Sequence, residues 1–72
     1  MKKTVDCRGM RCPLPIIACA KIIKEIEDGE SFFLLADDPA TKSDLQAWSR
    51  MTGHHSIAEG EERWLIEKKT KD

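Results

Sequence analysis

Residues 31–36 read Ser31-Phe32-Phe33-Leu34-Leu35-Ala36, a continuous apolar run of strand length. A run of this length that follows a helical segment is typical of a strand buried on both faces. It therefore predicts the central strand of a sheet, and the segments on either side of it determine what surrounds that strand.

On its N-terminal side, the chain from Pro13 onward predicts an amphipathic helix. Its apolar positions recur at the spacing of one helical face, in Ile16, Cys19, Ala20 and Ile23. Glycine favours the left-handed conformation that ends helices, so we expect this helix to stop near Asp28-Gly29. Ahead of it, residues 3–7 predict a short strand and residues 8–11 a loop.

On its C-terminal side, Asp37-Asp38-Pro39 predicts a capped second helix with the proline in its first turn. Leu45, Trp48 and either Met51 or Thr52 would form the inward stripe, and Gly53 would end the helix. Residues 54–58 and 63–68 then predict two strands joined by a tight turn at 59–62.

The predicted element order is β-α-β-α-β-β. Right-handed crossovers place both helices on one side of the sheet. We therefore expect an α+β fold, a two-layer α/β sandwich with one open face, in which residues 1–72 form a single domain.

Size and composition exclude several functional classes. A chain of 72 residues is too short for a dinucleotide-binding fold and shows no site for PLP or ATP, so we expect no cofactor. Twelve basic and thirteen acidic side chains give a net charge of −1, which argues against direct nucleic-acid binding. No apolar stretch reaches the roughly 18 residues of a membrane span. Without a signal-peptide core or a paired cysteine framework, we expect a cytoplasmic protein.

The motif with the clearest chemistry is Cys12-Pro13-Leu14-Pro15. Prolines are tolerated in the first helical turn, so Cys12 is expected at or beside the N-cap. There the helix dipole, together with Arg8 and Arg11, would favour its thiolate. A dipole effect of about 0.3–1 kcal/mol is worth less than about one pKa unit, which predicts a mildly acidic, accessible cysteine.

The other cysteines have different interpretations. Cys19 lies on the inward stripe and is expected to be core filler. Cys7 is either a half-buried residue at a strand end or a resolving thiol that pairs with Cys12. We expect no metal site, because the Cys-x4-Cys spacing lacks a nearby histidine and adjacent strand residues such as His54 and His55 point to opposite faces. Asp37-Asp38 is better explained by capping than by acid–base chemistry.

Taken together, several segments resemble the TusA/SirA-like family of sulfur carriers. These are the Asp6–Pro15 segment with its Cys-Pro-x-Pro motif, Gly29-Glu30, residues 36–41, Asp44 and Gly53-His54. The resemblance covers almost the whole chain and implies a mixed four-stranded sheet. It also implies that Cys12 accepts sulfane sulfur as a persulfide from a cysteine desulfurase or a rhodanese-like donor.

The same resemblance implies that the sulfur passes to an acceptor protein, as in tRNA thiolation, molybdenum-cofactor or sulfur-oxidation pathways. Such a protein is a sulfurtransferase component that works with partner enzymes rather than a complete enzyme. The residues that match the supporting motif are Asp6, Gly9, Arg11, Pro13 and Pro15. Asp38 and Pro39 match the family's entry to the second helix and are candidates for contact with partner proteins. A non-catalytic regulatory module and a redox-responsive adaptor using Cys7 and Cys12 are the alternatives.

Overall fold

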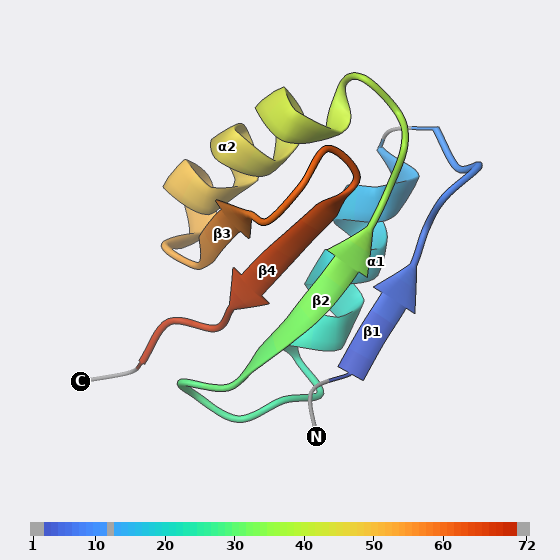
Figure 1. Ribbon diagram of the computed structural model, residues 1–72. Helices are drawn as coiled ribbons and strands as arrows, with labels where there is room; N and C mark the ends of the chain where they lie inside the picture. The colour runs from blue at the N-terminus through green and yellow to red at the C-terminus, as the bar shows by residue number, and fades with distance from the viewer. Residues whose placement is uncertain (1–2, 12, 71–72) are drawn as a thin grey trace.

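The computed structural model describes residues 3–11 and 13–70, which form two layers (Figure 1). Its elements follow the predicted order: β1 (Lys3–Asp6), α1 (Leu14–Ile23), β2 (Ser31–Leu35), α2 (Thr41–Thr52), β3 (His55–Ala58) and β4 (Arg63–Glu67). The predicted α+β class is confirmed.

The four strands form one mixed sheet in the order β1-β2-β4-β3. β2 is parallel to β1 and antiparallel to β4, and β3 pairs antiparallel with the other edge of β4. The apolar run is therefore a central strand, as predicted. Both helices cover the same face of the sheet, which leaves the other face without a helical layer (Figure 1).

The prediction that β2 is buried on both faces is wrong. Phe32 and Leu34 are fully buried beneath the helices, whereas Ser31, Phe33 and Leu35 on the other face are half-buried. On this open face the Arg63 guanidinium lies 4.2 Å from the centre of the Phe33 ring. A cation over an aromatic ring covers apolar surface while its charge stays hydrated. A continuous apolar run therefore occurs here in a strand that is fully buried on only one of its two faces.

Helix α1 ends at Ile23, well before the predicted end near Gly29. The N–H of Lys24 donates to the Lys21 carbonyl at 3.2 Å, and the N–H of Glu25 donates to the Ile22 carbonyl at 2.8 Å. These tighter three-residue bonds close the last turn.

Gly29 instead lies in the turn that leads to β2. It has a φ of +84°, and its N–H donates to the Lys68 carbonyl at 3.2 Å. Its left-handed conformation therefore serves this turn and not the helix end.

Helix α2 begins at Thr41, two residues after Pro39, so the proline precedes the helix instead of occupying its first turn. Asp38 shapes the entry: its carboxylate accepts the Ala40 N–H at 2.8 Å and its carbonyl accepts the Thr41 N–H at 3.0 Å. The end at Gly53 is confirmed by its φ of +82° and a bond from its N–H to the Ser49 carbonyl.

Of the residues predicted for the inward stripe of α2, Leu45 is buried and Trp48 and Thr52 are half-buried. Met51, in contrast, is 86% exposed, so the stripe continues through Thr52. The side chain of Met51 is left at the surface of the helix layer.

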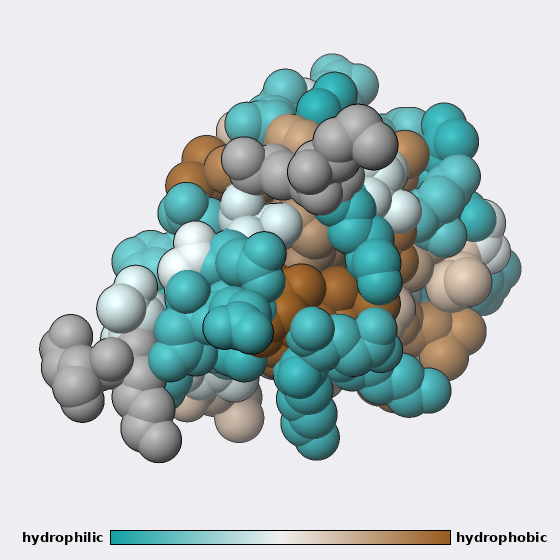
Figure 2. Space-filling model, turned by 90° about the horizontal axis from the view of Figure 1, so that it is seen from below, coloured by the Kyte–Doolittle hydropathy of each residue, from teal (hydrophilic) through white to brown (hydrophobic). Residues whose placement is uncertain are grey.

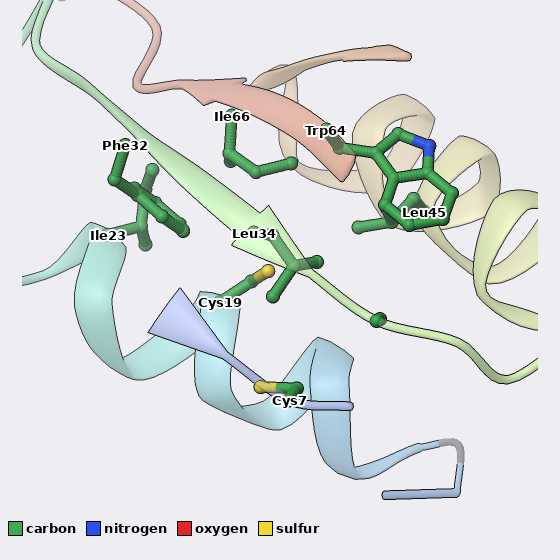
Figure 3. Close-up of a cluster of buried hydrophobic side chains, with 9 residues drawn as sticks. Cys7, Cys19, Ile23, Phe32, Leu34, Leu45, Trp64 and Ile66 are labelled. Atoms are coloured by element: carbon green, nitrogen blue, oxygen red, sulfur yellow. The ribbon is translucent and has the colours of Figure 1, made fainter. Parts of the chain in front are cut away.

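The core lies between the sheet and the helices (Figure 3). Its members come from both layers and from the loops after β1 and β2: Cys7, Cys19, Ile23, Phe32, Leu34, Ala36, Leu45, Trp64 and Ile66. Burial of each large apolar side chain contributes about 1.5–3 kcal/mol. Seen from below, hydrophobic side chains reach the surface between hydrophilic ones, so the two layers do not close completely at this end (Figure 2). Within residues 3–11 and 13–70, no helix has the length and apolar character of a membrane span.

Candidate functional site

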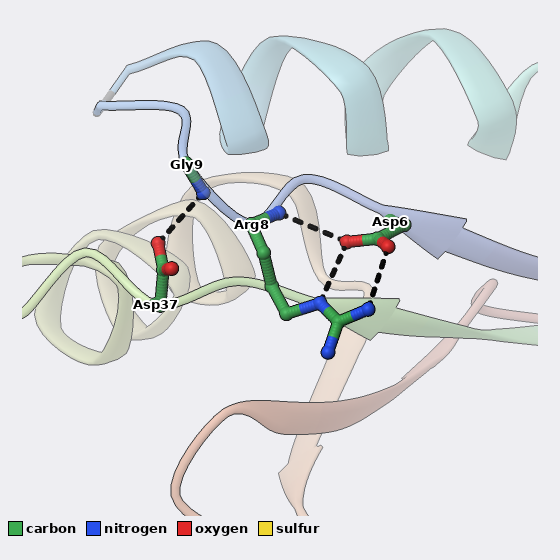
Figure 4. A network of polar contacts seen from close by, with 4 residues as sticks. All are labelled: Asp6, Arg8, Gly9 and Asp37. Carbon is green, nitrogen blue, oxygen red and sulfur yellow. Dashed lines mark hydrogen bonds and ion pairs between the residues drawn. The ribbon is translucent and has the colours of Figure 1, made fainter.

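The loop after β1 and the loop after β2 lie together at one edge of the sheet. β1 and β2 are parallel, so their carboxyl ends meet at this edge. The Gly9 N–H donates to the Asp37 carboxylate at 2.9 Å and joins the two loops (Figure 4). Gly9 has a φ of +85°, which a residue with a Cβ rarely adopts. The entrances to α1 and α2 are therefore held as one structural unit.

Cys12, the predicted sulfur-carrying residue, lies outside the described residues, but its neighbours are described. Arg11 and Pro13 are exposed, and the Leu14 N–H donates to the Arg11 carbonyl at 2.9 Å. The chain turns here and enters α1 at Leu14. Pro15 lies in the first turn of α1 and is buried. The N–H groups of a first turn have no partner within the helix, so a proline there loses no hydrogen bond.

Asp6 and Arg8 form a fork at the start of the same loop (Figure 4). The Asp6 carboxylate accepts bonds from the Arg8 Nε at 3.0 Å, from its Nη2 at 2.8 Å and from its backbone N–H at 3.0 Å. These hydrogen bonds lower the pKa of Asp6 to about 2. The Arg8 charge is thus engaged by Asp6, which leaves Arg11 as the exposed cation immediately before Cys12.

Cys7 and Cys19 lie in the core beneath this edge (Figure 3). Cys19 is fully buried, as its place on the helix predicts, and this burial raises its pKa to about 12. Cys7 is 1% exposed, and burial raises its pKa above the ordinary value, with a smaller contribution from the charge of Asp6. Buried thiols of raised pKa are poor nucleophiles. The resolving role of Cys7 stays a prediction, and it requires Cys7 to leave the core.

The paired carboxylates of the second loop bond backbone N–H groups, but the predicted capping of α2 is wrong, because the N-cap residue is Ala40 and no described side chain caps the helix. Asp38 accepts the Ala40 N–H within its own turn, and Asp37 accepts the Gly9 N–H from the other loop. Sequence reasoning missed this contact of Asp37, because it joins residues that only strand pairing brings together. One sequence feature could have indicated this contact. Gly9 is suited to a positive φ, and the loop after the neighbouring parallel strand is rich in carboxylates that can accept its N–H.

Of the two histidines, His54 has contacts within the fold. The Nδ1 of His54 accepts the Lys69 N–H at 3.1 Å, and its ring centre lies 5.4 Å from that of Trp48. Partial burial, followed by the charges of Lys69 and Lys68, lowers the pKa of His54. His55 is exposed on β3. No group of three metal-ligating side chains occurs among the residues that the structure describes.

An apolar groove of about 350 Å³ lies between the two helices, and its lining includes Pro13, the residue that follows Cys12 in the sequence. Its lining residues are Pro13, Ile16, Asp44, Ala47, Trp48 and Met51. We call it the α1–α2 groove. Leu14 and Ile17 on α1 are also exposed, by 52% and 46%. Large apolar side chains gathered at a surface are typical of protein-interaction sites.

Comparison with known proteins identifies the family and supports the fold. The sequence model of the family described as Sulfurtransferase TusA matches residues 3–68. The fold is also similar to that of a SirA-like protein from Desulfitobacterium hafniense, with a TM-score of 0.67 and 24% sequence identity. That match covers 88% of this chain and 89% of the other.

Proposed function

The chain belongs to the TusA sulfurtransferase family, and on this premise we propose that it carries sulfur as a persulfide on Cys12. It receives the sulfur from a cysteine desulfurase or a rhodanese-like protein and passes it to a cysteine of an acceptor protein. Asp6, Gly9, Arg11, Pro13 and Pro15 form the loop and helix entry that support this step.

The observation that carries the proposal is the contrast among the three cysteines. Cys7 and Cys19 are sealed in the core and have raised pKa values. Cys12 stands in the chain between the exposed residues Arg11 and Pro13, at the entrance of α1. A sulfur that is exchanged between proteins must be reachable by a second thiol, so Cys12 is the best candidate.

The proposed chemistry consists of two exchanges. The Cys12 thiolate attacks the outer sulfur of the donor persulfide, and the donor cysteine leaves as a thiolate. An acceptor thiolate then attacks the outer sulfur held on Cys12, forms the new persulfide and releases the Cys12 thiolate. The positive end of α1 and the charge of Arg11 favour the thiolate at both steps. Neither exchange needs an external oxidant or reductant.

The surface around the site suits transient binding of a partner protein. The α1–α2 groove and the exposed Leu14 and Ile17 give a partner apolar surface to contact. Asp38 and Pro39 stand at the neighbouring α2 entrance and are the second candidate contact. A donor or acceptor that docks on these surfaces would bring its cysteine to the Cys12 position.

We place this relay in the cytoplasm, with residues 1–72 acting as a single domain. The pathways proposed for it are tRNA thiolation or related sulfur trafficking.

The test is incubation of the reduced protein with a cysteine desulfurase and cysteine, followed by intact mass measurement without reductant. We expect the wild type to gain the mass of one sulfur atom and Cys12→Ser to gain none. Cys7→Ser and Cys19→Ala are matched controls and should load like the wild type. Equal loading of Cys12→Ser would overturn the proposal.

A further inference from the structure

A second hollow, of about 610 Å³, lies between the entrance of α2 and the turn that joins β3 to β4. Apolar lining comes from Pro39, Ala58 and Trp64, and charged lining from Asp37, Asp38, Lys42, Glu61 and Glu62. We call it the Trp64 pocket. It shares no lining residue with the α1–α2 groove. Its turn is held in place, since the Glu59 N–H donates to the Arg63 carbonyl and the Ala36 N–H donates to the Glu62 carbonyl.

Trp64 lines this pocket and carries a hydrogen-bond donor for which the described residues provide no partner. The residue is only 6% exposed, and no hydrogen bond from its indole Nε1 is found among the described residues. Within the same residues, every fully buried side-chain nitrogen and oxygen has a partner, so Nε1 must reach solvent. Trp64 is also one of the residues that line the pocket. Figure 3 shows this nitrogen on the edge of the ring that faces away from Cys7 and Cys19.

The charge around the pocket is predominantly negative. Among the described residues that line it, four are carboxylates and one, Lys42, is a cation. The neighbouring cations are already engaged: Arg63 lies 3.7 Å from Glu59, and Arg8 is paired with Asp6. The Asp37 carboxylate accepts the Gly9 N–H from the loop after β1, and the Asp38 carboxylate accepts the Ala40 N–H at the entrance of α2. Glu61 and Glu62 are exposed on the turn and face the pocket, so their charge is open to a visiting group.

This negative field already acts on one cation of the chain. The pKa of Arg8 is raised, first by its hydrogen bond and ion pair with Asp6, and further by the charges of Glu62 and Asp37. A second cation placed in the pocket would experience the same attraction.

We propose that the Trp64 pocket binds a segment of a partner protein that contains arginine or lysine. A main-chain carbonyl of this segment accepts the hydrogen bond from Trp64 Nε1, and its cationic side chain pairs with Glu61 and Glu62. The apolar lining covers the stem of the basic side chain. This inference goes beyond the sulfur-carrier role, because the binding needs neither Cys12 nor the α1–α2 groove. Asp38 and Pro39, which are also proposed contacts of the sulfur partners, contribute to the lining of the pocket.

The test follows the two indole N–H signals of the full-length, ¹⁵N-labelled, reduced protein by NMR, with Trp48→Phe assigning the Trp64 signal. Acetyl-Gly-Arg-Gly-amide is the probe, and acetyl-Gly-Glu-Gly-amide is its matched control. We expect the arginine peptide to shift the Trp64 signal saturably and the glutamate peptide to leave it unmoved. Added salt should weaken the binding, because the ion pairs lie at the surface.

A charge-matched pair of variants identifies the residues responsible. Glu61→Gln with Glu62→Gln should weaken binding of the arginine peptide by about tenfold, the effect of losing two surface ion pairs. Glu25→Gln with Glu27→Gln makes the same change in net charge elsewhere and should leave the binding unchanged.

Three results would each overturn the proposal. They are the absence of a saturable shift, equal shifts with the two peptides, and an equal shift with magnesium chloride, which would assign the pocket to a metal cation. The two-peptide comparison is made on the wild-type protein, so it decides the matter even if a variant fails to fold.

Discussion

The Gly9 N–H donates a 2.9 Å hydrogen bond to the Asp37 carboxylate across 28 residues of sequence. This bond ties the segment before α1 to the segment before α2. Through it, the loop that contains Cys12 is held against the loop that borders the Trp64 pocket. The candidate sulfur site and the proposed peptide site are therefore connected, and Asp38 and Pro39, proposed as contacts of the sulfur partners, also line the Trp64 pocket.

Removal of the acceptor should loosen this connection. Asp37→Ala leaves the Gly9 N–H to water, and we expect a loss of about 0.5–1 kcal/mol in the free energy of unfolding, the lower range for an exposed hydrogen bond. Asp37→Asn keeps an oxygen at the same place and should lose less. Urea unfolding followed by far-UV circular dichroism measures both. Equal stability of Asp37→Ala and the wild type would show that the bond is not formed in solution.

A glycine is required at position 9 because of its backbone conformation, and not because a larger side chain would clash with its neighbours. An added Cβ meets nothing within 4 Å, but the φ of +85° is unfavourable for alanine. We therefore expect Gly9→Ala to lower the free energy of unfolding by about 1 kcal/mol. Gly60 is the matched control, because its surroundings are equally open and its φ lies outside the left-handed region. Urea unfolding should find Gly60→Ala as stable as the wild type, and equal losses in both variants would contradict this explanation.

The Asp6–Arg8 fork predicts a pH dependence. Arg8 lowers the pKa of Asp6 from 3.8 to about 2 in the folded protein. When the pKa of a group is lower in the folded than in the unfolded state, the ionised group stabilises the fold at pH values above its unfolded-state pKa. This stabilisation is lost as the pH falls through the folded-state pKa. Stability should therefore decrease between about pH 4 and pH 2. NMR titration of the Asp6 carboxyl carbon should have its midpoint near 2. In Arg8→Gln this midpoint should move toward 3.8, and an unmoved midpoint would mean that the fork is absent.

Burial should protect two of the thiols. In a Cys12→Ser background at pH 8, we expect iodoacetamide to leave Cys7 and Cys19 unmodified in the native protein, because both are buried and protonated. Intact mass should show two additions once urea is present. Rapid modification of Cys7 in the native state would instead show that it leaves the core readily, as the resolving role requires.

The raised pKa of Cys19 has a stability consequence at high pH. Its folded pKa of about 12 lies above the ordinary value of 9.0. Protonated Cys19 therefore makes its full contribution to the free energy of unfolding below about pH 9. This contribution is lost as the pH rises toward about 12. In Cys19→Ala this part of the pH dependence should disappear from urea unfolding curves measured across that range. An identical dependence in the variant would assign the effect to other groups.

Local sequence determined the element order of this protein. The apolar run at 31–36 makes the central strand, the helical spacing after Pro13 makes α1, and Gly53 ends α2 in the left-handed conformation. Each of these features depends on residues within one or two turns of each other. Their preferences act before any distant contact forms, which is why the pattern alone predicts them.

Within the candidate site, sequence reasoning correctly placed Cys19 in the core and the proline-flanked entrance at the start of α1. It could not find the contact of Asp37 with Gly9 or the pocket at Trp64. The residues of each lie on separate loops or strands that are neighbours only after the sheet has assembled.

Tertiary structure decided where α1 stops and how much of β2 stays exposed. After α1, Lys68 donates from its Nζ to the Ile26 carbonyl, 42 residues away, and accepts the Gly29 N–H on its own carbonyl. These bonds favour a turn where glycine by itself predicted a helix end. The open face of β2 has the same origin, since both helices lie on one side. Local pattern sets the conformation of a segment, whereas partners from distant segments determine its limits and its exposure, because such contacts exist only once the strands have paired.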